Sequence, residues 1–210
     1  MEKKEFQRLA VRTESIVDKI DVTVGDGTAF LAILRSFNAA GELLDMYKKH
    51  IFYGRPLNVE LMKTEIATVT AYGEHARDCF VGAANPIDPL SRPGTLDMDP
   101  RIFHALLGTI TEHAEIGQAM EKALMGREEL DLVNVCEELG DSDWYKALFF
   151  EATGISWDDV QEMIIKKLEI RYGDKIFTDG EANKRDLEAE RELLEASVKE
   201  AVEAYHGSNG

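Results

Sequence analysis

The sequence is short of three features that would each point to a particular class of protein. It has only two cysteines, Cys79 and Cys136, so a disulfide scaffold is not expected and a reducing compartment is the default. It has no apolar run long enough to span a bilayer, and its first residues lack the apolar core of a signal peptide. We therefore expect a cytoplasmic protein with no membrane partner; for a viral protein this would be the cytoplasm of the host.

Positive charge is also scarce, because 24 Lys and Arg residues face 40 Asp and Glu residues and the formal net charge is -16. Such a surface repels nucleic-acid backbones, so we expect no nucleic-acid partner. It attracts divalent cations, whereas a bare anionic substrate would need a metal ion or local Lys and Arg side chains beside it. The length of 210 residues allows one large domain or two small ones.

The pattern of apolar residues is helical almost throughout, and no stretch shows the sustained alternation of a half-buried strand. An all-α helical bundle is therefore the expected fold class. Three of the five prolines lie between residues 82 and 94, which marks the clearest linker. We expect an N-terminal copy at 1–84, a linker at 85–100 and a second copy at 101–210, or one compact domain. The predicted helices span residues 3–20, 29–53, 59–81, 100–126, 130–153, 157–171 and 181–205.

Two long helical pairs look like a tandem repeat with a constant shift of 73 positions and no gaps. The alternative is that two amphipathic helix pairs of similar length share apolar positions by chance. If the repeat is real, the first copy lacks two acidic residues of the second, because Ala39 stands for Glu112 and Thr68 for Asp141. The coinciding pairs include Phe30 and Phe103, Ala32 and Ala105, Glu42 and Glu115, Glu65 and Glu138, and Tyr72 and Tyr145.

Four acidic residues of the second copy have the spacing of a metal site. Glu112 and Glu115 are three residues apart on one predicted helix, and Glu138 and Asp141 have the same spacing on the next. Residues three apart share a helix face, so antiparallel helices could bring all four carboxylates together. Oxygen ligands of this kind suit Mg2+ or Mn2+, which would relieve their mutual repulsion.

Each acidic pair alone is weak evidence for a metal site, because a chain with 40 acidic residues contains many such pairs on solvated faces. Two observations favour the site: both pairs have apolar neighbours, and Gly140 stands inside a predicted helix, where it costs up to about 1 kcal/mol against Ala. The close approach of another helix or a ligand would explain that glycine.

Candidate phosphate ligands follow on the next predicted helix. Lys167 and Arg171 are four residues apart and share a face, and Arg and Lys both bind phosphate oxygens. The plain alternative is a basic helix end that interacts with the helix dipole. Trp144 and Tyr145 could stack on a base, although an aromatic residue on a bundle helix is more often part of the core.

These residues carry a resemblance to a known family. Glu-x-x-Glu, 22 intervening residues and Glu-x-x-Asp resemble the metal signature of the MazG-like all-α nucleoside triphosphate pyrophosphohydrolases. The resemblance covers about residues 101–195 and the first helix. Two departures concern the substrate pocket: residues 123–127 differ from the family's connection between the metal-bearing helices, and Ala114 stands where glycine is common. The similar stretches are Phe6–Thr13, Leu130–Asp141 with Trp144 and Tyr145, Lys167–Tyr172, Asp174–Thr178, Arg185–Leu187 and, in the first copy, His50–Leu57.

The resemblance implies a MazG-like helical bundle and an Mg2+-dependent enzyme that converts a (d)NTP and water to a (d)NMP and pyrophosphate. Glu112, Glu115, Glu138 and Asp141 would hold Mg2+, for which Mn2+ could substitute, and Glu112 or Glu138 would orient or deprotonate the attacking water. A homodimer is expected, since family members build their sites at subunit contacts. The residues expected to bind phosphate or nucleotide are Lys167, Arg171, Lys175, Tyr172 and Trp144.

A second function stays open from the sequence. The chain could be a non-catalytic acidic helical binding or scaffold protein with a structural divalent cation, because the first copy shows that this sequence can lose carboxylates. The sequence does not distinguish a housecleaning role from a viral or regulatory one, and it does not specify the base or the sugar.

Overall fold

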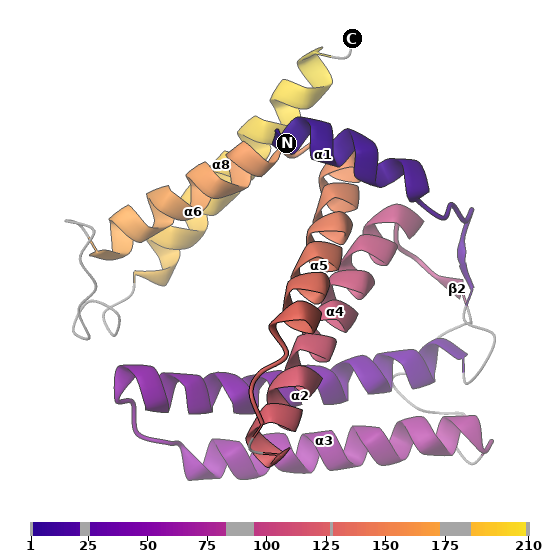
Figure 1. Cartoon of the computed structure of the whole chain (residues 1–210), viewed down its shortest axis with the longest axis vertical. Coiled ribbons are helices and arrows are strands. Elements are labelled where there is room, and N and C mark those ends of the chain that lie inside the picture. The colour runs from indigo at the N-terminus through magenta and orange to yellow at the C-terminus, as the bar shows by residue number, and fades with distance from the viewer. Residues whose placement is uncertain (1, 22–25, 83–94, 127, 173–185, 209–210) are drawn as a thin grey trace. The chain divides into compact units, whose positions relative to one another are not determined.

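The computed structural model describes residues 2–21, 26–82, 95–126, 128–172 and 186–208, and most of these are helical (Figure 1). The all-α fold class predicted from the sequence is confirmed. Among the helices described, none combines the length and apolar character needed to cross a membrane. The helices are α1 Lys3–Ala10, α2 Asp26–Tyr53, α3 Val59–Phe80, α4 Pro100–Gly126, α5 Leu132–Thr153, α6 Trp157–Tyr172 and α8 Leu187–Ser208.

The predicted first helix, residues 3–20, is wrong beyond Ala10. A short 3-10 helix, Val11–Thr13, follows α1, and the chain then forms strand β1, Ile20–Asp21. This strand pairs in antiparallel fashion with β2, Thr95–Leu96, so that Ile20 lies opposite Leu96. The partner strand is distant in the sequence, and therefore no local alternation of residues signals the pairing.

The chain forms two compact units. One comprises residues 18–98, and the other comprises residues 1–17 together with 99–210. The second unit is therefore discontinuous in sequence, since α1 packs against α5. This differs from the division expected at residue 84, which placed the first helix with the first copy. Residues 85–94 of the expected linker lie outside the described part of the chain.

In the first unit, α2 and α3 pack against each other through small residues. Ala29, Ala32, Ala39 and Ala76 are buried, which allows the two helix backbones to approach closely. The Ser36 hydroxyl donates a hydrogen bond to the carbonyl oxygen of Val69 over 2.9 Å. The larger apolar side chains stay exposed: they include Ile33, Phe37, Leu44, Ile51, Phe52, Ile66 and Phe80.

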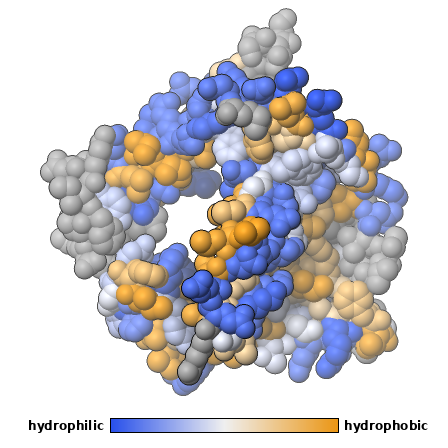
Figure 2. All heavy atoms as spheres, in the orientation of Figure 1, coloured by the Kyte–Doolittle hydropathy of each residue, from blue (hydrophilic) through white to orange (hydrophobic). Residues whose placement is uncertain are grey.

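In the second unit, α4 packs against α5, and α6 packs against α8. The N-terminal segment is fixed to this unit by two polar contacts. The indole Nε1 of Trp144 donates to the carbonyl oxygen of Ala10 over 2.9 Å, and Arg101 forms a bidentate ion pair with Glu14 over 2.7 and 2.8 Å. In the face drawn in Figure 2, apolar patches alternate with polar ones over the helices.

The bounds of the helices follow the 73-residue shift. Helix α5 begins at Leu132 and ends at Thr153, each 73 positions after the corresponding end of α3, Val59 and Phe80. The capping residues obey the same shift, since Asn58 caps α3 and Asp131 caps α5 through their side-chain oxygens. Helices α2 and α4 also end 73 positions apart, at Tyr53 and Gly126, although α2 has 28 residues and α4 has 27.

Candidate metal centre

Capping residues fix where the two carboxylate-bearing helices begin. The Asp99 carboxylate accepts hydrogen bonds from the backbone N–H groups of Arg101 and Ile102 over 2.9 and 3.0 Å, and Pro100 occupies the first turn of α4. The Asp131 carboxylate accepts from the backbone N–H groups of Val133 and Asn134, each over 3.1 Å. These caps set the register of α4 and α5, and hence the direction of the acidic side chains.

Small and well-buried residues hold the two helices together. On α4, Ala105 and Gly108 are buried, and on α5 Ser142 and Ala147 are fully inaccessible. Helix α5 ends at Gly154, whose φ of 75° lies in the left-handed region that favours glycine. The close packing brings the acidic face of α4 against that of α5.

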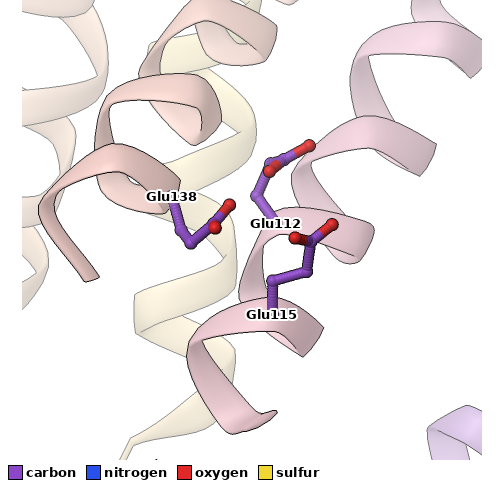
Figure 3. A group of neighbouring side chains, drawn as sticks. All are labelled: Glu112, Glu115 and Glu138. Atoms are coloured by element: carbon purple, nitrogen blue, oxygen red, sulfur yellow. The ribbon is translucent and has the colours of Figure 1, made fainter. Parts of the chain in front are cut away.

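The structure brings three of the four predicted carboxylates together. Glu112 and Glu115 extend from α4 and Glu138 from α5, and one oxygen from each lies within 4.8 Å of the others. Figure 3 shows Glu138 opposite Glu112 and Glu115. Glu138 is buried, with 5% of its surface exposed, whereas Glu115 is exposed. The group therefore has a closed side at α5 and an open side at α4.

The fourth predicted ligand, Asp141, lies beside this group and is not part of it. Its side chain is exposed, and it lines a pocket of about 290 Å³ together with Glu112, Trp144 and Tyr145. The negative charge of Asp141 also contributes to the raised pKa of Glu112. Asp141 is thus close enough to share the electrostatic field of the carboxylates.

The raised pKa of Glu112 is the clearest electrostatic feature of the site. Burial, a hydrogen bond with Glu138 and the charges of Glu115, Glu138 and Asp141 raise the pKa of Glu112 from the ordinary value of 4.5 to about 7. Without a cation, Glu112 therefore holds a proton near neutral pH. A divalent cation would take the place of that proton, and the all-oxygen donor set fits a hard ion such as Mg2+ or Mn2+.

Asn134 is a site residue that the sequence reasoning missed. Its side-chain Nδ2 donates to Glu138 Oε1 over 2.7 Å. This contact orients the Glu138 carboxylate, as hydrogen bonds from residues behind the ligands do in metal sites. The i,i+4 spacing of Asn134 and Glu138 was a signal that could have revealed it.

Aromatic side chains form the other wall of the pocket. The rings of Trp144 and Tyr145 pack edge to face at 4.9 Å between centroids, and His104 contacts both, at 5.9 and 5.5 Å. The Tyr145 ring lies directly on Gly108, because a Cβ atom there would come within 2.1 Å of it. The pKa of the Tyr145 phenol is raised by burial and by the charges of Glu112, Asp141 and Glu115.

Three of the residues expected to bind phosphate or nucleotide, Lys167, Arg171 and Tyr172, are not among the described residues that line this pocket. Arg171 on α6 forms a bidentate ion pair with Glu190 of α8 over 2.9 and 2.7 Å, and both side chains are largely buried. Tyr172 lies beside Arg171, whose guanidinium carbon is 5.8 Å from the ring centre. Lys167 is on the same helix, half-buried, and Lys175 lies outside the described residues. The structure therefore does not bring Lys167, Arg171 or Tyr172 to the described lining of the pocket, whereas Trp144, which was also expected to bind nucleotide, does line it.

Of the two explanations for Gly140, the close approach of another helix is wrong for the described residues, and the approach of a ligand stays a prediction. A Cβ atom added at Gly140 meets nothing within 4 Å among the described atoms, and the residue is exposed on α5. No neighbouring helix approaches there in the described structure. The glycine that does allow a close approach is Gly108, on the opposite helix.

No family model, curated protein or solved structure matches this chain, so its likeness to the MazG-like enzymes rests on the motif residues themselves.

Proposed function

We propose that this protein is an Mg2+-dependent nucleoside triphosphate pyrophosphohydrolase of the MazG-like type. The observation that carries the proposal is the convergence of Glu112, Glu115 and Glu138 from two helices, with ligand atoms within 4.8 Å of one another. The adjoining pocket supports it, since carboxylates and aromatic rings meet there and could receive phosphate and base, respectively.

Each residue of the site would have a different role in such a reaction. A divalent cation held by the carboxylates would polarise phosphate oxygens and supply a nucleophilic water. Glu138, fixed by Asn134, would keep one ligand oxygen in a constant position. Glu112, whose pKa is raised in the absence of a cation, would give up its proton on binding the cation and could then orient the attacking water. Glu115 and Asp141, both exposed, would face the substrate side.

One observation favours the alternative of a non-catalytic scaffold with a structural cation. The described lining of the pocket contains no Lys or Arg, and Arg171 is already paired with Glu190. In the enzyme, additional cations, Lys167, residues 173–185 or a second subunit would have to neutralise the triphosphate charge. In a scaffold, no such neutralisation is needed.

The deciding experiment measures pyrophosphate release with Mg2+ from a panel of canonical and modified NTPs and dNTPs. We expect selective hydrolysis by the wild-type chain and a loss of about a thousandfold in kcat for Glu138→Gln, because a carboxylate ligand is replaced by a neutral amide. The matched control is Glu65→Gln, the same substitution at the corresponding position of the first helix pair, which should leave kcat unchanged.

The outcomes separate the two functions. Hydrolysis that Glu138→Gln abolishes and Glu65→Gln spares would support the enzyme and identify its base. Absence of hydrolysis across the panel, together with Mn2+ binding that Glu138→Gln abolishes, would support the scaffold. Hydrolysis that survives Glu138→Gln would overturn the assignment of the site.

The expected homodimer can be tested separately. Large apolar side chains exposed in both units, such as Phe52 and Leu124, would be covered by association. Sedimentation of the whole chain at micromolar concentration should show a dimer, and only monomer would contradict this expectation.

A further inference from the structure

The differences between the two helix pairs gather around one pocket. Position 108 is glycine in the second pair, whereas the corresponding residue of the first pair is Arg35. In the first pair the guanidinium of Arg35 lies over the ring of Tyr72, 5.9 Å from its centre. In the second pair the bare backbone of Gly108 lies under the ring of Tyr145.

The change at position 108 accompanies the changes that create the acidic site. Gly108 lies one helical turn before Glu112 on α4, and Asp141 lies one turn before Tyr145 on α5. The first pair keeps the tyrosine as Tyr72 but lacks the glycine and both carboxylates, since Ala39 and Thr68 replace Glu112 and Asp141. The glycine therefore belongs with the acidic pocket and is not a general requirement for packing two such helices.

The contact between Gly108 and Tyr145 leaves the ring no room to move toward α4. A Cβ atom at position 108 would lie 2.1, 2.3 and 2.3 Å from three ring atoms, Cε1, Cδ1 and Cζ. Trp144 and His104 also pack against this ring, edge to face. Because Cζ carries the hydroxyl, the glycine fixes the end of the side chain that carries the polar group.

We propose that Tyr145 contacts the substrate through its hydroxyl and that Gly108 is the positioning residue that holds this hydroxyl beside Glu112. The proposal rests on the proposed function, since it assigns a further substrate contact to the same pocket. Tyr145 and Glu112 both line the pocket, so a phosphate group held near Glu112 comes within reach of a hydrogen bond from the phenol. Such a donor adds a neutral contact to phosphate where the described lining has no Lys or Arg.

The first test compares Tyr145→Phe with Tyr72→Phe, the same substitution in the first helix pair. With a nucleoside triphosphate that the wild type hydrolyses, Tyr145→Phe should raise KM about tenfold, the loss expected for a hydrogen bond to a charged group. The Kd for Mn2+ alone should change less than twofold, because the carboxylates are intact. Tyr72→Phe should alter neither quantity. An unchanged KM in Tyr145→Phe would overturn the proposal.

The second test asks whether Gly108 acts through Tyr145. Gly108→Ala should raise KM at least tenfold with Mn2+ binding retained, because the added methyl group displaces the ring. In a Tyr145→Ala background the same substitution should change KM less than twofold. Equal effects in the two backgrounds would overturn the positioning role. Tyr145→Phe remains the deciding variant if Gly108→Ala fails to fold.

A failure of the proposed function is distinguishable from a failure of this proposal. If the wild type binds Mn2+ but hydrolyses no nucleotide, the hydrolase is overturned, and titration with inorganic pyrophosphate in Mg2+ replaces KM as the readout. About tenfold weaker pyrophosphate binding by Tyr145→Phe would then support the contact. Equal binding by wild type and Tyr145→Phe, or no pyrophosphate binding by either, would overturn it.

Discussion

The α2–α3 and α4–α5 helix pairs are spaced by a constant shift, and α3 and α5 match in length and in N-cap, yet the pairs differ in what they bury. The first pair buries Ala39 where the second places Glu112, although both pairs expose large apolar side chains. The second pair places three carboxylates within 4.8 Å of one another. The comparison shows that the same arrangement of two helices can hold either apolar residues or a cluster of carboxylates between them. The cluster requires protons or a cation to offset the repulsion.

The largest effect on stability should come from a contact that only the second unit has. Arg171 and Glu190 form a buried bidentate ion pair between α6 and α8, elements without a counterpart in the first pair. Glu190→Gln should reduce the free energy of unfolding of this region by about 3 kcal/mol, because it leaves a buried guanidinium without its charge partner. Hydrogen exchange should then accelerate in α6 and α8. Equal acceleration in α2 and α3 would show that the two units unfold together.

A second prediction exchanges the residues that distinguish the two pairs. Ala39 is 4% exposed, so Ala39→Glu should lower the free energy of unfolding by about 2 kcal/mol, because it places a carboxylate at a buried position. Glu112→Ala should instead raise the stability of the protein in EDTA at pH 8, because it removes repulsion among the acidic groups. Urea denaturation measures both. Destabilisation by Glu112→Ala in EDTA would show that the cluster is not repulsive.

The affinity for Mn2+ should depend on pH through the second helix pair alone. Because the pKa of Glu112 is raised to about 7, Mn2+ must displace a proton below that pH. The Kd for Mn2+ should therefore rise about tenfold per pH unit below about 7 and level off above it. Glu112→Gln should remove this dependence. A Kd that is constant between pH 6 and 8 in the wild type would contradict the raised pKa.

The same shift predicts how stability changes with pH in the absence of a cation. A carboxyl group whose pKa is raised on folding binds its proton more tightly in the folded state. Its stabilising contribution is complete below its ordinary pKa of 4.5 and is lost as pH rises through about 7. Added Mg2+ at pH 8 should restore stability, and thermal unfolding with and without EDTA measures this.

The smallest effect concerns Gly140, whose counterpart in the first pair is Ala67. Nothing described lies within 4 Å of a Cβ atom at position 140, so Gly140→Ala should stabilise the protein by about 0.5 to 1 kcal/mol through helix propensity. The reverse change, Ala67→Gly, should destabilise it by a similar amount. Destabilisation by Gly140→Ala would indicate that a ligand or partner approaches this face.

Most of the fold follows from local patterns in the sequence. The start of α6 is an example: the Ser156 hydroxyl accepts a hydrogen bond from the backbone N–H of Asp159 over 3.2 Å, and such a cap depends only on neighbours about three residues away. The end of α1 and the pairing of Ile20 with Leu96 were not predictable in this way. Both depend on residues distant in sequence, for which helical periodicity carries no signal.

In the candidate site, too, the features that depend on neighbouring residues could be predicted and those that depend on distant residues could not. The convergence of Glu112 and Glu115 with Glu138 follows from helix spacing and from a short connection. The ion pair of Arg171 could not be predicted in this way, because its partner Glu190 comes from α8. Helical spacing does not indicate which acidic residue of another helix faces a basic residue. Gly108 was not predicted as a residue of the site, because its role depends on the ring of Tyr145 on the facing helix.

The discontinuity of the second unit sets an order of events during synthesis. Helix α1 is made first, but the Trp144 indole that holds its last residue, Ala10, is 134 residues further along. At about 5 to 20 residues per second, the ribosome needs roughly 7 to 27 s to reach it. All of residues 18–98 are made in that interval. Helices α2 and α3 can therefore pair on the nascent chain before α5, against which α1 packs, has been synthesised.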